Sequence, residues 1–138
     1  MKKVILKGRA MHGGIAEGEA VVTKEGLGGM SVFDMNTGRV VEIGSDINGQ
    51  NVKGKILVFK CGKGSSSWVL WHQVLRFMAV SPKAYIVKEC NPQTALGAAV
   101  LRCPFITEFD DDPTQVISTG DWVKVNGDKG VVEIIKKE

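Results

Sequence analysis

The chain has 138 residues, of which 43% are hydrophobic and 24% are charged, and its formal net charge is +3. This length and composition are typical of one soluble domain with one modest core. No apolar stretch approaches the roughly 20 residues that span a bilayer, and the lysines are scattered rather than clustered. We therefore expect a cytoplasmic protein that binds neither membrane nor nucleic acid.

The first half of the sequence indicates short strands separated by glycines. Residues 3–7 and 19–23 are rich in β-forming side chains and are predicted strands. Residues 25–54 contain many Gly, Asn and Asp, which predicts loops with one short strand near residues 39–43.

In the middle of the chain, strands and helices alternate. The continuous apolar runs at 55–59 and 84–87 are typical of strands buried on both faces. Between them, Trp68, Trp71, Leu75 and Met78 have helical spacing, so residues 67–80 are a predicted helix that Ser81-Pro82 should end. A short helix over 92–101 and a strand over 103–107 complete a right-handed parallel unit of three strands.

The end of the sequence, residues 120–134, predicts a hairpin whose turn is Asn126-Gly127. The expected fold class is therefore α/β. We expect residues 1–138 to form a single compact domain, in which a parallel βαβαβ part packs beside an antiparallel β part.

The three cysteines, Cys61, Cys90 and Cys103, have no CxxC spacing. An odd number of thiols in a cytoplasmic chain argues against a disulfide framework, and their spacing matches no iron–sulfur ligand run. We expect core or loop thiols, and neither a metal nor a cofactor bound by this chain.

The loop most suited to chemistry connects the first buried strand to the first helix and reads Cys61-Gly62-Lys63-Gly64-Ser65-Ser66-Ser67-Trp68. Such loops lie at the carboxyl edge of a parallel sheet, where ligands bind. Both glycines let the backbone adopt positive φ and approach a ligand closely, and Lys63 with the helix start favours an anion. Either Ser66 or Ser67 should cap the helix. The alternative is a turn whose residues serve only capping and chain reversal.

Three other polar positions are weaker candidates. His72 is predicted to be a structural histidine at the edge of the core. His12, in the turn Met11-His12-Gly13-Gly14, could approach a ligand. The run Asp110-Asp111-Asp112 before Pro113 indicates an exposed turn or a helix start rather than a cation site.

From the serine loop outward, the chain resembles the swivel domain, or small subunit, of the aconitase X family, which includes dehydratases of phosphomevalonate and of cis-3-hydroxy-L-proline. The resemblance extends over nearly the whole chain. It rests on Lys7-Gly8-Arg9, Gly18-Glu19-Ala20, Gly28-Gly29, Asn36-Thr37-Gly38, Gly54-Lys55-Ile56-Leu57-Val58-Phe59, Gly62-Lys63-Gly64-Ser65, Ala84-Tyr85-Ile86-Val87, Ala95-Leu96-Gly97-Ala98 and Gly120-Asp121.

The resemblance implies a two-subunit hydro-lyase that is active only with a larger partner subunit, which would hold iron or an iron–sulfur cluster. It implies that Ser65 is the base that removes the proton alpha to a substrate carboxylate. The substrate would be a small carboxylate, with or without a phosphate. Its expected binding residues are Gly62, Lys63, Gly64, Ser66 and Ser67.

One feature departs from the family pattern. Family members have a Gly-Ser pair a few residues beyond the serine, whereas here Ser65-Ser66-Ser67-Trp68 leads directly into the helix. The resemblance therefore leaves the substrate open.

Two other functions compete with this one. The segment from Pro104 to Val123 is also similar to a phosphohistidine-type swivelling carrier domain, but Thr94 stands in the segment where the carrier histidine is expected, and no His follows His72. The other alternative is a non-catalytic interaction module.

Overall fold

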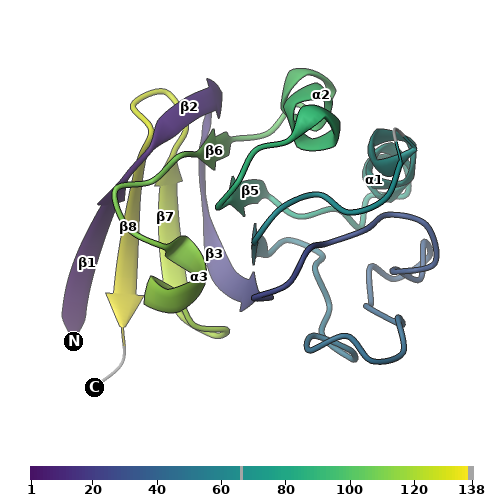
Figure 1. The fold of residues 1–138 in the computed structure, drawn as a ribbon. Helices are drawn as coiled ribbons and strands as arrows, with labels where there is room; N and C mark the ends of the chain where they lie inside the picture. The colour runs from purple at the N-terminus through teal and green to yellow at the C-terminus, as the bar shows by residue number, and fades with distance from the viewer. Residues whose placement is uncertain (66, 137–138) are drawn as a thin grey trace.

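The computed structural model describes residues 1–65 and 67–136, which form one curled, eight-stranded sheet and three helices (Figure 1). The strands neighbour one another in the order β1-β8-β7-β3-β4-β5-β6-β2. The strands are β1 (Lys2–Lys7), β2 (Arg9–His12), β3 (Ile15–Val22), β4 (Ile56–Phe59), β5 (Ala84–Val87), β6 (Phe105–Thr107), β7 (Trp122–Asn126) and β8 (Val131–Lys136). The helices are α1 (Trp68–Phe77), α2 (Pro92–Val100) and α3 (Pro113–Val116).

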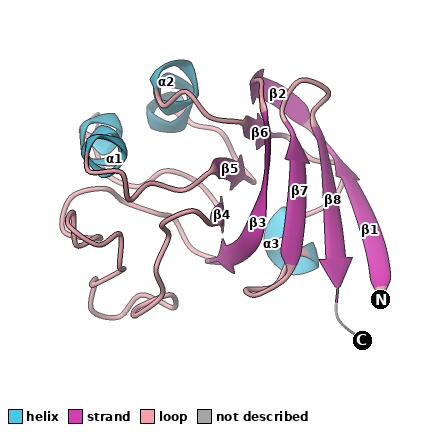
Figure 2. Cartoon of the chain, turned by 180° about the vertical axis from the view of Figure 1, so that it is seen from behind, coloured by secondary structure: helices cyan, strands magenta, loops and turns pink. Residues whose placement is uncertain are grey.

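The long strand β3 joins the two parts of the sheet. Residues 15–19 pair with β7 in the antiparallel part, and residues 20–22 pair with β4 in the parallel part. Strands β4, β5 and β6 are parallel to one another, as predicted, and α1 and α2 lie together on the side away from β1, β7 and β8 (Figure 2). The mixed α/β architecture is thereby confirmed.

A sharp bend at Gly8 connects β1 to β2, the two strands that lie at opposite ends of the sheet. Strand β1 pairs with β8, and the next strand, β2, pairs with β6. A Cβ at Gly8 would lie 2.7 Å from the carbonyl oxygen of Thr107, so only glycine fits this corner. Strand β2 was not among the predicted strands, and His12 ends this strand rather than standing within a turn.

The two faces of the central strands build two separate cores. In β4, Ile56 and Val58 face the antiparallel part of the sheet, whereas Leu57 and Phe59 face the helices. The same alternation continues in β5. All four residues of each strand are buried, so the prediction of strands covered on both faces is confirmed.

The core beneath the helices contains His72, which is fully buried rather than at the core edge. Its ring stacks on Trp68 at a centroid distance of 3.9 Å. Its Nε2 lies 3.1 Å from the carbonyl oxygen of Gly28, and its Nδ1 lies 2.8 Å from the hydroxyl of Tyr85. Because a carbonyl only accepts, Nε2 carries the proton and Nδ1 accepts from Tyr85. Burial lowers the pKa of His72 to about 4, so the ring is neutral at pH 7.

Two predicted chain reversals differ from those observed. Helix α1 ends at Phe77, and Ala79 reverses the chain with a φ of 60° before Ser81-Pro82 is reached. Asn126 belongs to β7 and pairs with Val131, so the hairpin loop has four residues, 127–130. Its side chain accepts the N–H groups of residues 128 and 129, a local bond that replaces the two-residue turn.

Residues 23–55 form a long irregular arm instead of containing a strand at 39–43. The described arm is held by isolated bridges, Phe33 to Val40 and Arg39 to Asn51, and by turns. The acidic run before Pro113 starts α3, as expected. There Asp112 accepts the N–H of Thr114 and pairs with Lys88 at 3.0 Å.

Close packing of α2 on α1 makes Gly97 the preferred residue at its position. A Cβ there would lie 2.6 Å from Cζ3 of Trp68, which is buried and cannot move away.

We expect Gly97→Ala to lower the free energy of unfolding by about 1–3 kcal/mol, although alanine is favoured over glycine in helices by about 1 kcal/mol. Urea unfolding measures this. Ala99→Gly, at an exposed site on the same helix, should cost about 1 kcal/mol from propensity alone. An unchanged or more stable Gly97→Ala protein would contradict the packing.

Burial of neutral His72 makes stability depend on pH. The unfolded histidine binds a proton below its ordinary pKa of 6.5, but the folded one only near 4. Stability is therefore fully present above pH 6.5 and falls as the pH drops towards 4, by about 3 kcal/mol from this group. Urea unfolding at several pH values should show a smaller loss for His72→Gln than for the unsubstituted chain. NMR titration of the His72 ring is an independent test, because the ring should stay neutral down to about pH 5. Protonation of the ring near pH 6.5 would contradict its burial.

Candidate active site

The loops that follow β4, β5 and β6 all lie at the carboxyl edge of the parallel strands. Strand β2 begins at the same edge, because it is antiparallel to β6 and places Arg9 opposite Thr107. The serine loop, the segment before α2 and the segment after β6 therefore border one side of the molecule, where ligands of open α/β sheets usually bind.

The glycines of the serine loop have different roles. Gly64 has a φ of 94°, as expected, whereas Gly62 does not adopt positive φ. A Cβ at Gly62 would lie 2.9 Å from Cγ2 of Thr94 and 3.0 Å from Oδ1 of Asn91. Gly62 is thus required by the close approach of α2, and not by the positive φ that a glycine permits.

The first turn of α2 holds this loop in place through two amide side chains. Asn91 Nδ2 donates to the carbonyl oxygen of Gly62, and Gln93 Nε2 donates to that of Gly64, both at 2.7 Å. Sequence reasoning missed both residues. The Asn-Pro pair indicates a helix start, but nothing in the sequence shows that this start faces the serine loop.

Ser65 lies at the start of α1 with two possible donors beside its hydroxyl. Its Oγ is 2.8 Å from Oγ of Ser67 and accepts the backbone N–H of Ser67 at 3.3 Å. Ser67 stands at the N-cap position, as one of the two residues expected there, but its side chain makes no capping bond. Its hydroxyl contacts Ser65 instead. Ser66, the other expected cap and a predicted binding residue, lies outside the described residues.

Two cavities meet at Ser65. One, of about 200 Å³, is lined by Lys63, Ser65 and Ser67, by Gly28 and Gly29 on the opposite wall, and by Glu42. The other, of about 250 Å³, is largely apolar and lies against Pro92, Gln93 and Leu96. A small molecule in either cavity can contact Ser65. The polar cavity offers the ammonium group of Lys63 and the positive end of α1 to an anion.

The buried ring cluster supports the wall opposite Ser65. Trp68 Nε1 donates to the carbonyl oxygen of Leu27 at 2.8 Å, and His72 donates to that of Gly28. The N–H of Lys63 also donates to Leu27, at 2.8 Å. Both walls of the polar cavity are therefore fixed to α1 and to the loop that precedes it.

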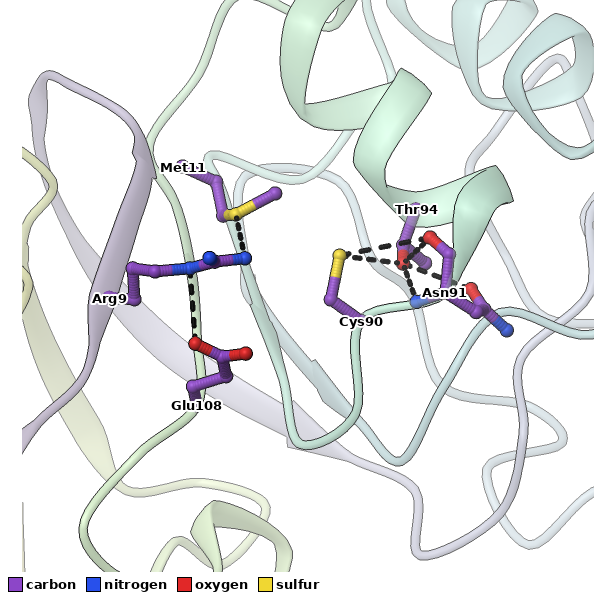
Figure 3. A network of polar contacts seen from close by, with 6 residues as sticks. All are labelled: Arg9, Met11, Cys90, Asn91, Thr94 and Glu108. Carbon is purple, nitrogen blue, oxygen red and sulfur yellow. Dashed lines mark hydrogen bonds and ion pairs between the residues drawn. The ribbon is translucent and has the colours of Figure 1, made fainter.

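Figure 3 shows two further groups of polar contacts at the carboxyl edge, one around Arg9 and one around Thr94. Arg9 Nε pairs with Glu108 Oε2 at 3.1 Å. In the second group, the Oγ1 of buried Thr94 accepts the N–H of Asn91 at 3.0 Å and lies 3.4 Å from Sγ of Cys90.

The structure does not bring the three thiols together. Cys61 follows β4 and Cys90 precedes α2, both at the carboxyl edge, whereas Cys103 precedes β6 at the amino edge. Burial raises the pKa of Cys103 to about 12. Across residues 1–65 and 67–136, no three His, Cys, Asp or Glu side chains are grouped to hold a metal ion.

Comparison with known proteins agrees with this geometry. Residues 5–134 match the aconitase X swivel domain. The phosphomevalonate dehydratase small subunit of Archaeoglobus fulgidus is 43% identical, with 93% of this chain and 96% of the relative covered. That of Methanosarcina mazei is 35% identical, with 99% and 95% covered.

Solved structures show the same relationship. Aconitase X of Thermococcus kodakaraensis in its holo form superposes with a TM-score of 0.89 at 39% identity, covering 96% of this chain and 99% of that one. None of the described helices is long and apolar enough to cross a membrane.

Because the family model matches residues 5–134 and the relatives are similar over nearly the whole chain, the chain belongs to the aconitase X family, as its swivel domain.

Proposed function

We propose that this chain, the small subunit of an aconitase X-type dehydratase, supplies the catalytic base of the enzyme through Ser65. The observation that carries the proposal is the position of Ser65 Oγ. It stands at the start of α1, within reach of the hydroxyl and the N–H of Ser67, in a cavity shared with Lys63.

A serine hydroxyl becomes a base only where its alkoxide is stabilised. Donors aimed at the oxygen and nearby positive charge favour the ionised form. Ser67 provides a backbone and a side-chain donor, the first turn of α1 provides partial positive charge, and Lys63 provides a full one. The glycine at position 64 keeps the approach to Ser65 open, because nothing lies within 4 Å of where its Cβ would be.

The reaction proposed for this site is elimination of water from a β-hydroxy acid. The Ser65 alkoxide takes the proton from the carbon next to the carboxylate. The electron pair of that C–H bond forms the double bond, and the hydroxyl on the adjacent carbon leaves as hydroxide, which together with the proton now held by Ser65 accounts for one molecule of water. An iron or iron–sulfur centre in the larger subunit would act as the Lewis acid that assists the leaving hydroxyl.

A phosphorylated hydroxy acid is the proposed substrate class, and phosphomevalonate is the first compound to test. Relatives at 35% and 43% identity over nearly the whole chain carry that activity in their names. In the polar cavity, Lys63 and the helix start suit one anionic group of such a molecule. The apolar recess beside Leu96 suits its hydrocarbon part.

The carrier-domain alternative has no support at its essential position. Thr94 in the first turn of α2 is fully buried, and its hydroxyl is engaged with Asn91. A phosphoryl group could not reach it. The family membership and this burial together favour the dehydratase.

Ser65→Ala is expected to abolish turnover in the assembled complex, because it removes the only proposed base. General-base catalysis typically contributes about 10²–10⁴-fold, and loss here should reach the upper part of that range. Ser67→Ala should cost less, since it leaves the backbone donor in place. Steady-state kinetics of the complex co-expressed with its larger subunit measures both effects.

Circular dichroism and size-exclusion chromatography of each complex serve as controls for folding and assembly. Thr119→Ala, which removes an exposed hydroxyl that accepts the N–H of Val22 and lines neither cavity at Ser65, is a matched hydroxyl deletion that should leave kcat unchanged. Near-normal turnover of Ser65→Ala in an intact complex would remove this serine from the mechanism.

Gln93 is proposed to position Ser65 through the carbonyl of Gly64, so Gln93→Glu should lower kcat. A carboxylate has nearly the shape of the amide but cannot donate to the carbonyl, and misplacing a reacting group by about 1 Å can cost up to 10²-fold. We expect a loss of at least about tenfold in kcat with little change in thermal stability. Gln93→Lys, which restores a donor, should recover part of the rate.

Gln115→Glu, an exposed amide on α3, is the matched control for the added negative charge. Equal kinetics of the Gln93→Glu and Gln115→Glu complexes would show that the amide bond does not position the loop.

A further inference from the structure

We propose a second binding site, at the amino edge of the parallel strands, that takes a small organic anion carrying phosphate or carboxylate groups. The site is a cavity of about 590 Å³. This volume lies within the roughly 300–1,000 Å³ typical of small-molecule pockets. Binding at this second site does not depend on the role proposed for Ser65.

This amino-edge cavity lies at the opposite end of the strands from the serine loop. The segments preceding β5 and β6 line it through Lys83 and Arg102, the last turn of α1 lines it through Arg76, and the start of β3 lines it through Glu17. None of its lining residues is shared with the two cavities at Ser65. It is therefore a separate site.

Three cationic side chains surround the cavity. Arg76 and Arg102 take part in no ion pair or side-chain hydrogen bond within the described residues, so their guanidinium groups are available to a ligand. Lys83 Nζ donates to the backbone oxygen of Glu17 at 3.3 Å, which holds its ammonium group at the rim. Planar guanidinium groups bind carboxylate and phosphate oxygens in pairs, with more specificity than a single ammonium group.

The opposing negative charge is smaller. Glu17 is the acidic residue of the lining, and its carboxylate accepts a hydrogen bond from Trp122 Nε1 at 3.1 Å. The carboxyl ends of α1 and α2 face the same edge, and each contributes about half a negative charge. Three full positive charges exceed these together, so the cavity attracts anions.

The floor of the cavity is uncharged. It is formed by His72, Tyr85 and Cys103. Burial lowers the pKa of His72 to about 4 and raises that of Cys103 to about 12, while the Tyr85 pKa is raised well above its ordinary value. All three are neutral at pH 7. These groups add no repulsion to an anion, and Ile15, which is exposed and lines the cavity, provides apolar contact surface for an organic ligand.

NMR titration of the ¹⁵N-labelled full chain tests the proposal, with pyrophosphate and citrate as separate probes at constant ionic strength. We expect saturable shifts confined to residues 76–83 and 101–104 with at least one probe, and the probe that binds distinguishes a phosphate site from a carboxylate site. Arg76→Ala and Arg102→Ala should each weaken binding about tenfold or more, as expected for lost charged hydrogen bonds. Lys129→Ala, which removes an exposed cation in the hairpin loop, should change binding less than twofold.

Three results would overturn this second site. The first is shifts spread over surface lysines or centred on Lys63 with none at residues 76–83. The second is equal affinity of the Arg76→Ala and Lys129→Ala chains. The third is loss of binding when the complex with the larger subunit is titrated, because the partner would then cover the cavity.

Discussion

Two amide–carbonyl hydrogen bonds determine the shape of the serine loop, and the candidate chemistry depends on them. Asn91 and Gln93 reach from the first turn of α2 to the carbonyl oxygens of Gly62 and Gly64, which lie in a stretch with no regular secondary structure. Without these donors, the loop between β4 and α1 would keep only its backbone bridge to Leu27 on this side. Preorganisation of this kind lowers the cost of aligning a catalytic group, because the loop is ordered before the substrate binds.

The position of α2 follows in turn from packing on the aromatic core. Gly97 allows the helix to approach Trp68 closely, and Trp68 stacks on His72. The same two rings hold the carbonyl groups of Leu27 and Gly28, which form the opposite wall of the polar cavity. One buried cluster thus sets both sides of the site. A change in this core would alter the spacing around Ser65 before it altered the overall fold.

Local sequence patterns predicted the parts of the molecule that local physics controls. The apolar runs of β4 and β5 and the helical spacing after Trp68 were sufficient to find a parallel unit, and the glycine-rich loop before α1 pointed to the carboxyl edge. The pairing of residues 9–12 with β6 was not predictable, because it depends on a bend at Gly8 that closes the sheet over a separation of about a hundred residues in the chain. The contact of Gln93 with Gly64 likewise requires knowing that α2 packs beside α1. Asn126 was misassigned because its side chain caps a longer loop instead of turning the chain within two residues.

The orientation of α1 and α2 gives the two edges of the parallel strands opposite electrostatic requirements. Both helices begin at the carboxyl edge, where their free N–H groups and partial positive charge can stabilise an anion or an alkoxide without many basic side chains. Both end at the amino edge, where the partial charge is negative and exposed carbonyl groups favour cations. Arg76 in the last turn of α1 and Arg102 just beyond α2 meet this requirement. Since neither forms an ion pair with a described side chain, their charge exceeds what the helix ends need. The orientation of α1 and α2 therefore places N–H donors near Ser65 at the carboxyl edge. At the amino edge it is accompanied by unpaired positive charge over a cavity.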